Sequence, residues 1–303
     1  MKKILLGLAI VAVSALASGQ QLQVATGKAG DTYSTMLKQL AQRCGNTAAI
    51  TEVPSSGSND NINQLVGNQV NAAFVQSDVL WLRARTEDLG NVKTLLALHP
   101  EQVHIVAKAR SGLKAGGVMG IGGSEVVLHD ITALTGLRVG AAGGSLVTAQ
   151  VIRLQSEIPF HTMPFDKGDD VLAALDKGDI EAAIFVGGAP LGTIAKLGPQ
   201  YKLLPVPAPV LEKLKGVYRS ARLNYQKMGA TGVATVATDA LFVTREYKTP
   251  RMTDGLAKLR ACAVSSIDEL RETTGTHPAW QSVSADNRGK WPWYELPTQR
   301  STN

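Results

Sequence analysis

The sequence predicts an α/β fold built from two similar units, each with a glycine loop between a strand and a helix. Residues 22–39 read as a strand, a glycine loop and a helix whose apolar positions recur with helical spacing. The same order returns at residues 137–154. A second repeated pattern, a helix end followed by a glycine turn and an apolar strand, occurs at residues 65–75 and again at residues 172–185. These two repeated patterns favour two similar lobes, because a solenoid needs three or more repeats. The alternative is that short βα patterns recur by chance.

The composition is that of a folded protein. The chain has 303 residues, of which 44% are hydrophobic and 18% charged, enough for one large or two medium domains. The formal net charge is +6, but the lysines and arginines are scattered and no basic run is interleaved with aromatic residues. Nucleic-acid binding is therefore not expected.

The N-terminus has the features of a signal peptide. Lys2-Lys3 precede an apolar stretch from Ile4 to Val13, and Ala15-Leu16-Ala17 matches a cleavage site. We therefore expect residues 1–17 to be removed near Ala17, leaving a soluble periplasmic protein with a net charge lowered from +6 to +4.

The only two cysteines, Cys44 and Cys262, would then lie in an oxidising compartment. A disulfide between them is the natural hypothesis, and two separate buried thiols are the alternative. Because residues 231–243 form a β-rich run that can return the chain to the first lobe, we expect the disulfide to lie within one lobe.

The elements can be placed in order along the chain. After the first helix, which begins at Tyr33, the pattern predicts further helices from Ser58 or Asn59, from Asp78 and at residues 146–154 and 253–273. Strands are expected at residues 48–53, 70–75, 95–98, 103–107, 137–141 and 180–185. Residues 112–123 are glycine-rich and predict a loop or hairpin, and the prolines at 205–209 predict an extended connection.

These patterns divide the chain into lobes. The first part of lobe 1 spans residues 18–108, lobe 2 spans 109–227, and residues 228–303 return to lobe 1 and add a C-terminal helix and a tail. The chain is expected to cross between the lobes near Ala107 and Gly229.

Seven segments, in this order, resemble the TAXI family, the extracytoplasmic solute receptors of one class of TRAP (tripartite, ATP-independent) transporters. They are Ala25 to Tyr33, Ser56 to Asn61, Val70 to Val79, Ala97 to Glu101, Leu137 to Ala149, Asp176 to Pro190 and Thr276 to Ala279. The resemblance implies a two-lobed periplasmic-binding-protein fold, type II-like, with a ligand cleft between the lobes. It also implies delivery of the solute to a TRAP membrane permease driven by an ion gradient.

The resemblance further implies a small-molecule solute, an organic acid or an acidic amino acid. The chain departs from the family in two loops. Asp31 and Ser34 stand where the family usually has Gly and a second Tyr, and the family's Gly-Ser-Gly-Thr run is shortened to Gly143-Gly144-Ser145-Leu146. Asp31 would repel an anion placed beside it and would attract an amine.

The candidate ligand-binding residues belong to glycine loops and helix starts, where free N–H groups and the helix dipole attract anions. They are Thr26, Gly27, Asp31, Tyr33, Ser56, Gly57, Ser58, Asn61, Gln76, Ser77, Gly143, Gly144, Ser145, Thr148, Gly187 and Gly188. Helix capping is the alternative role for Ser58 and Ser145, and core packing is the alternative for Tyr33.

An enzyme is not expected. The five histidines show no metal-binding spacing, no G-x-S-x-G motif occurs, and neither cysteine has a thiol-active motif. The sequence therefore predicts a receptor without cofactor or metal. A sensor subunit that uses the same cleft to signal to a membrane receptor is the alternative, and an enzyme on this scaffold is a third.

Overall fold

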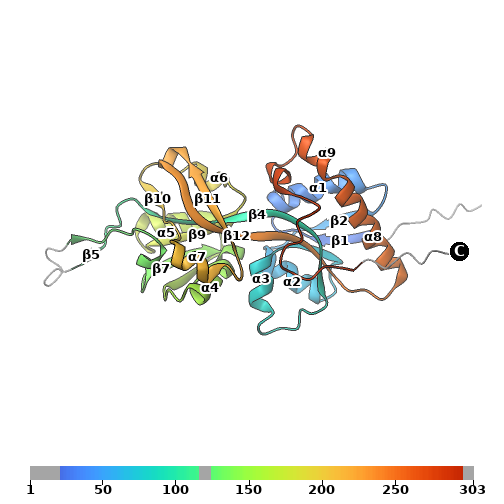
Figure 1. The fold of residues 1–303 in the computed structure, drawn as a ribbon, viewed down its shortest axis with the longest axis horizontal. Coiled ribbons are helices and arrows are strands. Elements are labelled where there is room, and N and C mark those ends of the chain that lie inside the picture. The colour runs from blue at the N-terminus through green and yellow to red at the C-terminus, as the bar shows by residue number, and fades with distance from the viewer. Residues whose placement is uncertain (1–20, 116–123, 296–303) are drawn as a thin grey trace, which may run out of the picture.

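Two long strands, β4 (Val92–Lys108) and β12 (Ala230–Arg245), run through both halves of this two-lobed molecule (Figure 1). The structure is a computed structural model that describes residues 21–115 and 124–295. The expected signal peptide, residues 1–17, lies outside the described residues, as does most of the glycine-rich stretch 112–123. A ten-stranded sheet connects the lobes. Eight of its strands follow the order β2-β1-β3-β12-β4-β9-β7-β8, while β10 pairs with β4 and β11 with β12.

The first lobe contains the three strands that precede β4 in the sequence. β1 pairs in parallel with β2 and with β3, and β3 pairs antiparallel with the returning strand β12. Its elements are β1 (Gln21–Ala25), α1 (Thr32–Cys44), β2 (Ala49–Val53), α2 (Ser58–Val66), β3 (Ala72–Gln76), α3 (Ser77–Arg83), α8 (Pro250–Ser265), α9 (Ile267–Glu272) and η3 (Pro278–Ser282).

The second lobe repeats the parallel arrangement, because β7 pairs in parallel with β8 and β9. Its strands are β7 (Arg138–Ala142), β8 (His161–Phe165), β9 (Ala182–Gly187), β10 (Tyr201–Leu203) and β11 (Arg219–Tyr225), with the short pair β5 (Lys114–Ala115) and β6 (Ser124–Glu125). Its helices are η1 (Ile131–Leu134), α4 (Gly144–Ser156), α5 (Gly168–Lys177), α6 (Gly192–Ala195), α7 (Ala208–Leu214) and η2 (Gln226–Met228).

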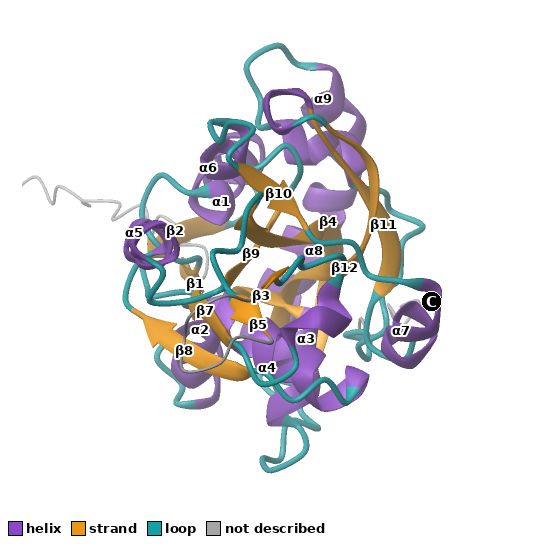
Figure 2. Cartoon of the chain, turned by 90° about the vertical axis from the view of Figure 1, so that its left-hand side faces the viewer, coloured by secondary structure: helices purple, strands orange, loops and turns teal. Residues whose placement is uncertain are grey.

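Each lobe buries apolar side chains on both faces of its part of the sheet. In the first lobe, α1, α8 and the buried Trp280 cover one face, and α2 and α3 cover the other. In the second lobe, α4 and α7 cover one face and α5 the other. Helices therefore flank the strands on both sides, as the view along the molecule shows (Figure 2).

Each of the two long strands changes its pairing partner partway along its length. β4 pairs with β12 from Val92 to Gln102 and with β9 from Gln102 to Ala107. β12 pairs with β11 up to Ala237 and with β3 from residue 240 onward. The limits of lobe 2 at residues 109–227 and the crossings near Ala107 and Gly229 stay predictions. The changes of pairing partner fall inside the long strands, at Gln102 of β4 and between residues 237 and 240 of β12.

Three further sequence predictions can be compared with the structure. The two strands expected on either side of His99-Pro100 are one continuous strand, and the register between β4 and β12 shifts beside Pro100, which has no N–H to donate. The C-terminal helix expected at residues 253–273 is two helices, divided at Ser266. The predicted disulfide is present and joins Cys44 of α1 to Cys262 of α8 within the first lobe, with 5.8 Å between the Cα atoms.

Among the described residues, no helix combines the length and the apolar character that a membrane crossing requires.

Candidate functional site

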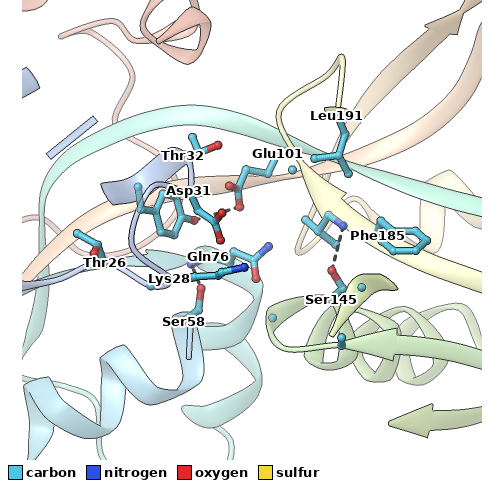
Figure 3. A pocket seen from close by; sticks show the side chains of 18 of the residues that line it. Thr26, Lys28, Asp31, Thr32, Ser58, Gln76, Glu101, Ser145, Phe185 and Leu191 are labelled. Atoms are coloured by element: carbon cyan, nitrogen blue, oxygen red, sulfur yellow. Dashed lines mark hydrogen bonds between the residues drawn. The ribbon is translucent and has the colours of Figure 1, made fainter. Parts of the chain in front are cut away.

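A cleft of about 590 Å³ lies between the two lobes. The N-termini of α1, α2, α4 and α5 all border it, at Thr32, Ser58, Gly144 and Gly168. These helix ends come from both lobes, and each presents N–H groups and the positive end of its dipole. The cleft can therefore hold an anionic or polar solute between two sets of donors (Figure 3).

The glycine loops of the two lobes approach each other closely. Gly143 precedes α4 with a φ of 53°, and a Cβ at this position would lie 3.7 Å from the carbonyl oxygen of Ser56 in the first lobe. A Cβ on Gly144 would lie 2.2 Å from Oε1 of Gln76, also in the first lobe. The absence of a Cβ at Gly144 therefore permits this close approach, and the positive φ at Gly143 favours a glycine there.

Most of the predicted ligand-binding residues line this cleft. They are Thr26, Gly27, Asp31, Tyr33, Ser56, Gly57, Ser58, Gln76, Gly144, Ser145 and Gly187. Two of their hydroxyl oxygens already accept hydrogen bonds: Ser58 Oγ from the N–H of Gln76 at 3.1 Å and Ser145 Oγ from the N–H of Val186 at 3.0 Å. The Ser145 hydroxyl retains its own O–H to donate.

Five predicted residues do not line the cleft: Asn61, Ser77, Gly143, Thr148 and Gly188. Asn61 is fully buried behind the loops, where its Nδ2 donates to the carbonyl oxygens of Thr26 and Phe74 at 3.0 and 2.7 Å. It therefore fixes the loop that carries Thr26.

Gly143 lies at the approach of the two glycine loops, and the other three residues contact groups behind the cleft. Ser77 Oγ and Thr238 Oγ1 lie 2.9 Å apart and Thr148 Oγ1 donates to Asp78 Oδ2 at 2.6 Å, while Gly188 lies against the ring of His99.

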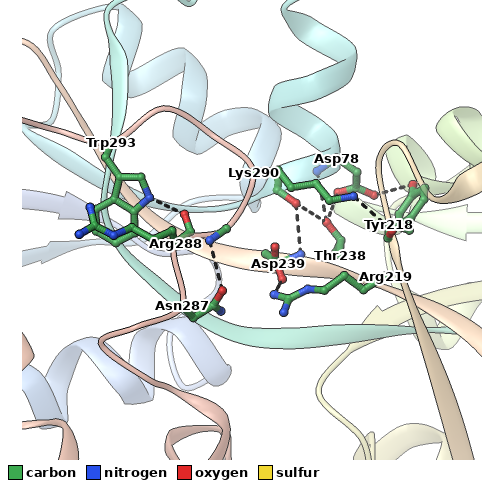
Figure 4. A network of polar contacts seen from close by, with 11 residues as sticks. Asp78, Tyr218, Arg219, Thr238, Asp239, Asn287, Arg288, Lys290 and Trp293 are labelled. Atoms are coloured by element: carbon green, nitrogen blue, oxygen red, sulfur yellow. Dashed lines mark hydrogen bonds and ion pairs between the residues drawn. The ribbon is translucent and has the colours of Figure 1, made fainter.

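A buried carboxylate, Asp78, joins the lobes beside the crossing strands (Figure 4). Oδ2 accepts hydrogen bonds from Thr148 Oγ1 and from Tyr218 OH, at 2.6 and 2.9 Å, and both donors belong to the second lobe. Oδ1 accepts from Thr238 Oγ1 of β12 at 3.1 Å. Burial raises the pKa of Asp78, and these three hydroxyl donors oppose that shift.

Two cationic side chains extend this network. Lys290 of the C-terminal segment donates to the carbonyl oxygen of Lys215 in the second lobe at 2.7 Å, and Arg219 pairs with Asp239 of β12 (Figure 4). The network therefore ties both lobes to the strands that pass between them.

A second carboxylate, Glu101, faces the cleft from the middle of β4 and was missing from the predicted site (Figure 3). Only 7% of Glu101 is exposed, and its Oε2 accepts a hydrogen bond from Tyr33 OH at 3.0 Å. Burial and the charge of Glu101 raise the pKa of Tyr33 well above its usual value. Tyr33 therefore stays protonated and donates its hydrogen.

Further residues of the cleft were not among the predicted ligand contacts. They include Lys28 and Thr32, which lie inside the predicted loop, and Phe185, Leu191, Thr193 and His277. Phe185 and Leu191 add apolar surface to the second lobe's side of the cleft. No local pattern marked Glu101, because β4 carries other polar residues, such as His99, Gln102 and His104, among its apolar ones.

Among the residues that the structure describes, no group of three or more His, Cys, Asp or Glu side chains is placed to hold a metal ion.

Residues 24–287 match the NMT1-like family, and the chain belongs to that family. Among solved structures, the chain is similar to Tv2483 bound to L-arginine, with 12% identity, a TM-score of 0.54, and coverage of 84% of this chain and 91% of that one. A protein from Bordetella bronchiseptica RB50 matches with 14% identity and a TM-score of 0.51, covering 87% and 75% of the two chains. An arginine-transport periplasmic binding protein from Legionella pneumophila matches with 11% identity and a TM-score of 0.48, covering 82% and 94%.

At these identities the similarity concerns the fold. The fold is the two-lobed α/β fold of periplasmic ligand-binding domains.

Proposed function

We propose that this protein is an extracytoplasmic solute receptor that captures a small, polar, carboxylate-bearing solute in the interlobe cleft and delivers it to a TRAP-type membrane permease. The observation that carries the proposal is the convergence of four helix N-termini from two lobes on one cleft of about 590 Å³. That volume lies within the range of roughly 300–1,000 Å³ that is usual for small-molecule sites.

A carboxylate fits the helix ends, because N–H groups at a helix N-terminus bind anions without a dedicated arginine. Lys28 adds a positive charge at the cleft. Gln76 is a further polar contact in the cleft. Gln76 is 4% exposed, and its Oε1 has no hydrogen-bond partner among the described residues, so an N–H or O–H group of the solute can donate to it.

The binding part of the proposal is tested by a thermal-shift screen of amino acids and small organic acids, since a ligand of the folded state raises the melting temperature. Isothermal titration then compares the best hit on the wild type and on Gln76→Ala. Loss of a hydrogen bond to a charged ligand atom should weaken binding about tenfold or more, from roughly 1.5–3 kcal/mol. Gln69→Ala, which changes an exposed glutamine outside the cleft, is the matched control and should leave the affinity unchanged.

The delivery part is tested by solute uptake into proteoliposomes that contain a TRAP permease from the same organism. Uptake that requires this protein and an ion gradient supports delivery. Binding without any stimulation of uptake would contradict the transport role and favour a sensor.

A further inference from the structure

Glu101 is a buried carboxylate whose hydrogen bonds the protein does not complete. Its Oε2 accepts one hydrogen bond, from Tyr33 OH. Its Oε1 lies 3.5 Å from Nε2 of His99, but neither ring nitrogen of His99 makes a hydrogen bond within the described part of the chain. An ionised carboxylate offers about four acceptor positions, so Glu101 retains acceptor capacity on the side of the cleft.

No lysine or arginine neutralises Glu101 among the described residues, where His99 is its one ion-pair neighbour. Burial of a carboxylate is expensive unless a cation or several donors compensate it. Glu101 lies next to Gln102, where the partner of β4 changes from β12 to β9, and its side chain lines the cleft. A cation that compensates its charge can therefore come from a solute in the cleft.

A second acid, Asp31, lines the same cleft from the start of α1 (Figure 3). Its side chain does not cap the helix, and it is in no ion pair within the described ranges. Two carboxylates from different elements therefore face a cleft in which Lys28 and the helix N-termini supply the positive charge. A simple anion would meet both attraction and repulsion in this cleft.

We infer that Glu101 is the recognition residue for an ammonium group, and that the solute is a zwitterion whose ammonium group contacts Glu101 while its carboxylate contacts the helix N-termini. The inference rests on the proposed function and specifies the chemical class of its solute. An ammonium group supplies three N–H donors and a positive charge, which match the unfilled acceptor positions of Glu101. Asp31 adds longer-range attraction for the same charge.

The test uses matched probes that share a carboxylate and a carbon chain but differ at the amine. The pairs are L-glutamate with 2-oxoglutarate, L-aspartate with L-malate, and L-alanine with L-lactate, each titrated calorimetrically into the full mature protein. For the pair that binds best, the amino acid should bind about tenfold more tightly or better, because a hydrogen bond to a charged group contributes roughly 1.5–3 kcal/mol. Equal or tighter binding of the oxo or hydroxy acid would overturn the role of Glu101 and leave the proposed carboxylate receptor standing. Failure of all six probes would contradict this inference. Failure of the whole screen would contradict the proposed function as well.

Glu101→Gln provides the second arm, because it keeps the shape of the side chain and removes its charge. The variant should bind the amino acid about tenfold more weakly or worse and should bind the oxo or hydroxy partner no more weakly than the wild type. Glu212→Gln, at an exposed glutamate paired with Lys215 outside the cleft, is the matched control and should preserve the preference for the amine. The comparison of probes on the wild type decides the question even if Glu101→Gln does not fold. A folded Glu101→Gln that still prefers the amine tenfold would refute the assignment.

Discussion

Replacement of Asp78 by alanine tests whether this buried carboxylate holds the two lobes together. The change removes the acceptor for three hydroxyl donors, Thr148 at 2.6 Å, Tyr218 at 2.9 Å and Thr238 at 3.1 Å. Each buried donor left without a partner costs roughly 1–3 kcal/mol, and removal of the buried charge offsets part of that sum. We expect Asp78→Ala to lower the free energy of unfolding by about 3–5 kcal/mol.

The assay is urea unfolding followed by circular dichroism at pH 7, with Asp78→Asn as the isosteric variant. Its amide can accept from Thr238 and donate to the other two hydroxyl oxygens, so it should lose less than half as much stability as Asp78→Ala. Glu87→Ala, at an exposed partner of Arg83, is the control and should change the stability by about 0.5 kcal/mol or less. A loss below about 1 kcal/mol for Asp78→Ala would refute the interlobe role.

The difference in unfolding free energy between the wild type and Asp78→Asn should change with pH in a defined direction. Because burial raises the pKa of Asp78 in the folded protein, the folded state binds this proton more tightly than the unfolded state. The stability gained by protonation is fully present below the unfolded pKa and is lost as the pH rises through the raised folded pKa. The wild type should therefore gain stability relative to Asp78→Asn as the pH falls from 7 toward about 4. No change in this stability difference over the range would contradict the raised pKa of Asp78.

Three further predictions concern closure, the disulfide and a buried histidine. Gly144→Ala places a Cβ 2.2 Å from Oε1 of Gln76. Calorimetry should therefore show weaker binding of the screened ligand, with little change in the stability of the free protein. Unchanged affinity would count against the close approach of Gly144 to Gln76. Thiol titration of the denatured, unreduced protein should find neither Cys44 nor Cys262 free, and reduction should lower the unfolding free energy by at most about 5 kcal/mol, since the bond spans 218 residues. Burial lowers the pKa of His104 from 6.5 to about 4, so the neutral ring's stabilisation is present above pH 6.5 and lost as the pH falls toward 4. Over that pH range, the unfolding free energy of the wild type, measured with urea, should fall by up to about 3 kcal/mol more than that of His104→Gln. Equal losses in the two proteins would refute the lowered pKa of His104.

The local pattern of the sequence was enough to predict the elements that carry the site. The strand, glycine loop and helix beginning at Leu22 form as expected, and their echo forms at residues 138–156. Apolar spacing and turn residues are properties of neighbouring positions, so they can be read without knowledge of the fold. The pairing of Cys44 with Cys262 followed from their number and from the expected return of the chain to the first lobe.

The features that the sequence did not predict depend on contacts between distant segments. His99-Pro100 appeared to separate two strands, but β12 pairs along β4 on both sides of Pro100 and the ladder shifts register to accommodate it. The same pairing turns Glu101 into the cleft, which no local pattern around it indicates.

The sequence also did not predict the direction in which the side chains of Asn61 and Thr148 point. Both follow helix starts that border the cleft, yet Asn61 bonds the backbone behind the loops and Thr148 bonds Asp78.

The most direct test of the account is hydrogen–deuterium exchange of the protein with and without a ligand from the thermal-shift screen. A solute held between the lobes should slow exchange in the loop Gly27–Tyr33 and at the start of α2 in the first lobe, and also at Gly144 and Ser145 in the second lobe. Protection confined to one lobe, or located away from all of these segments, would contradict an interlobe binding site.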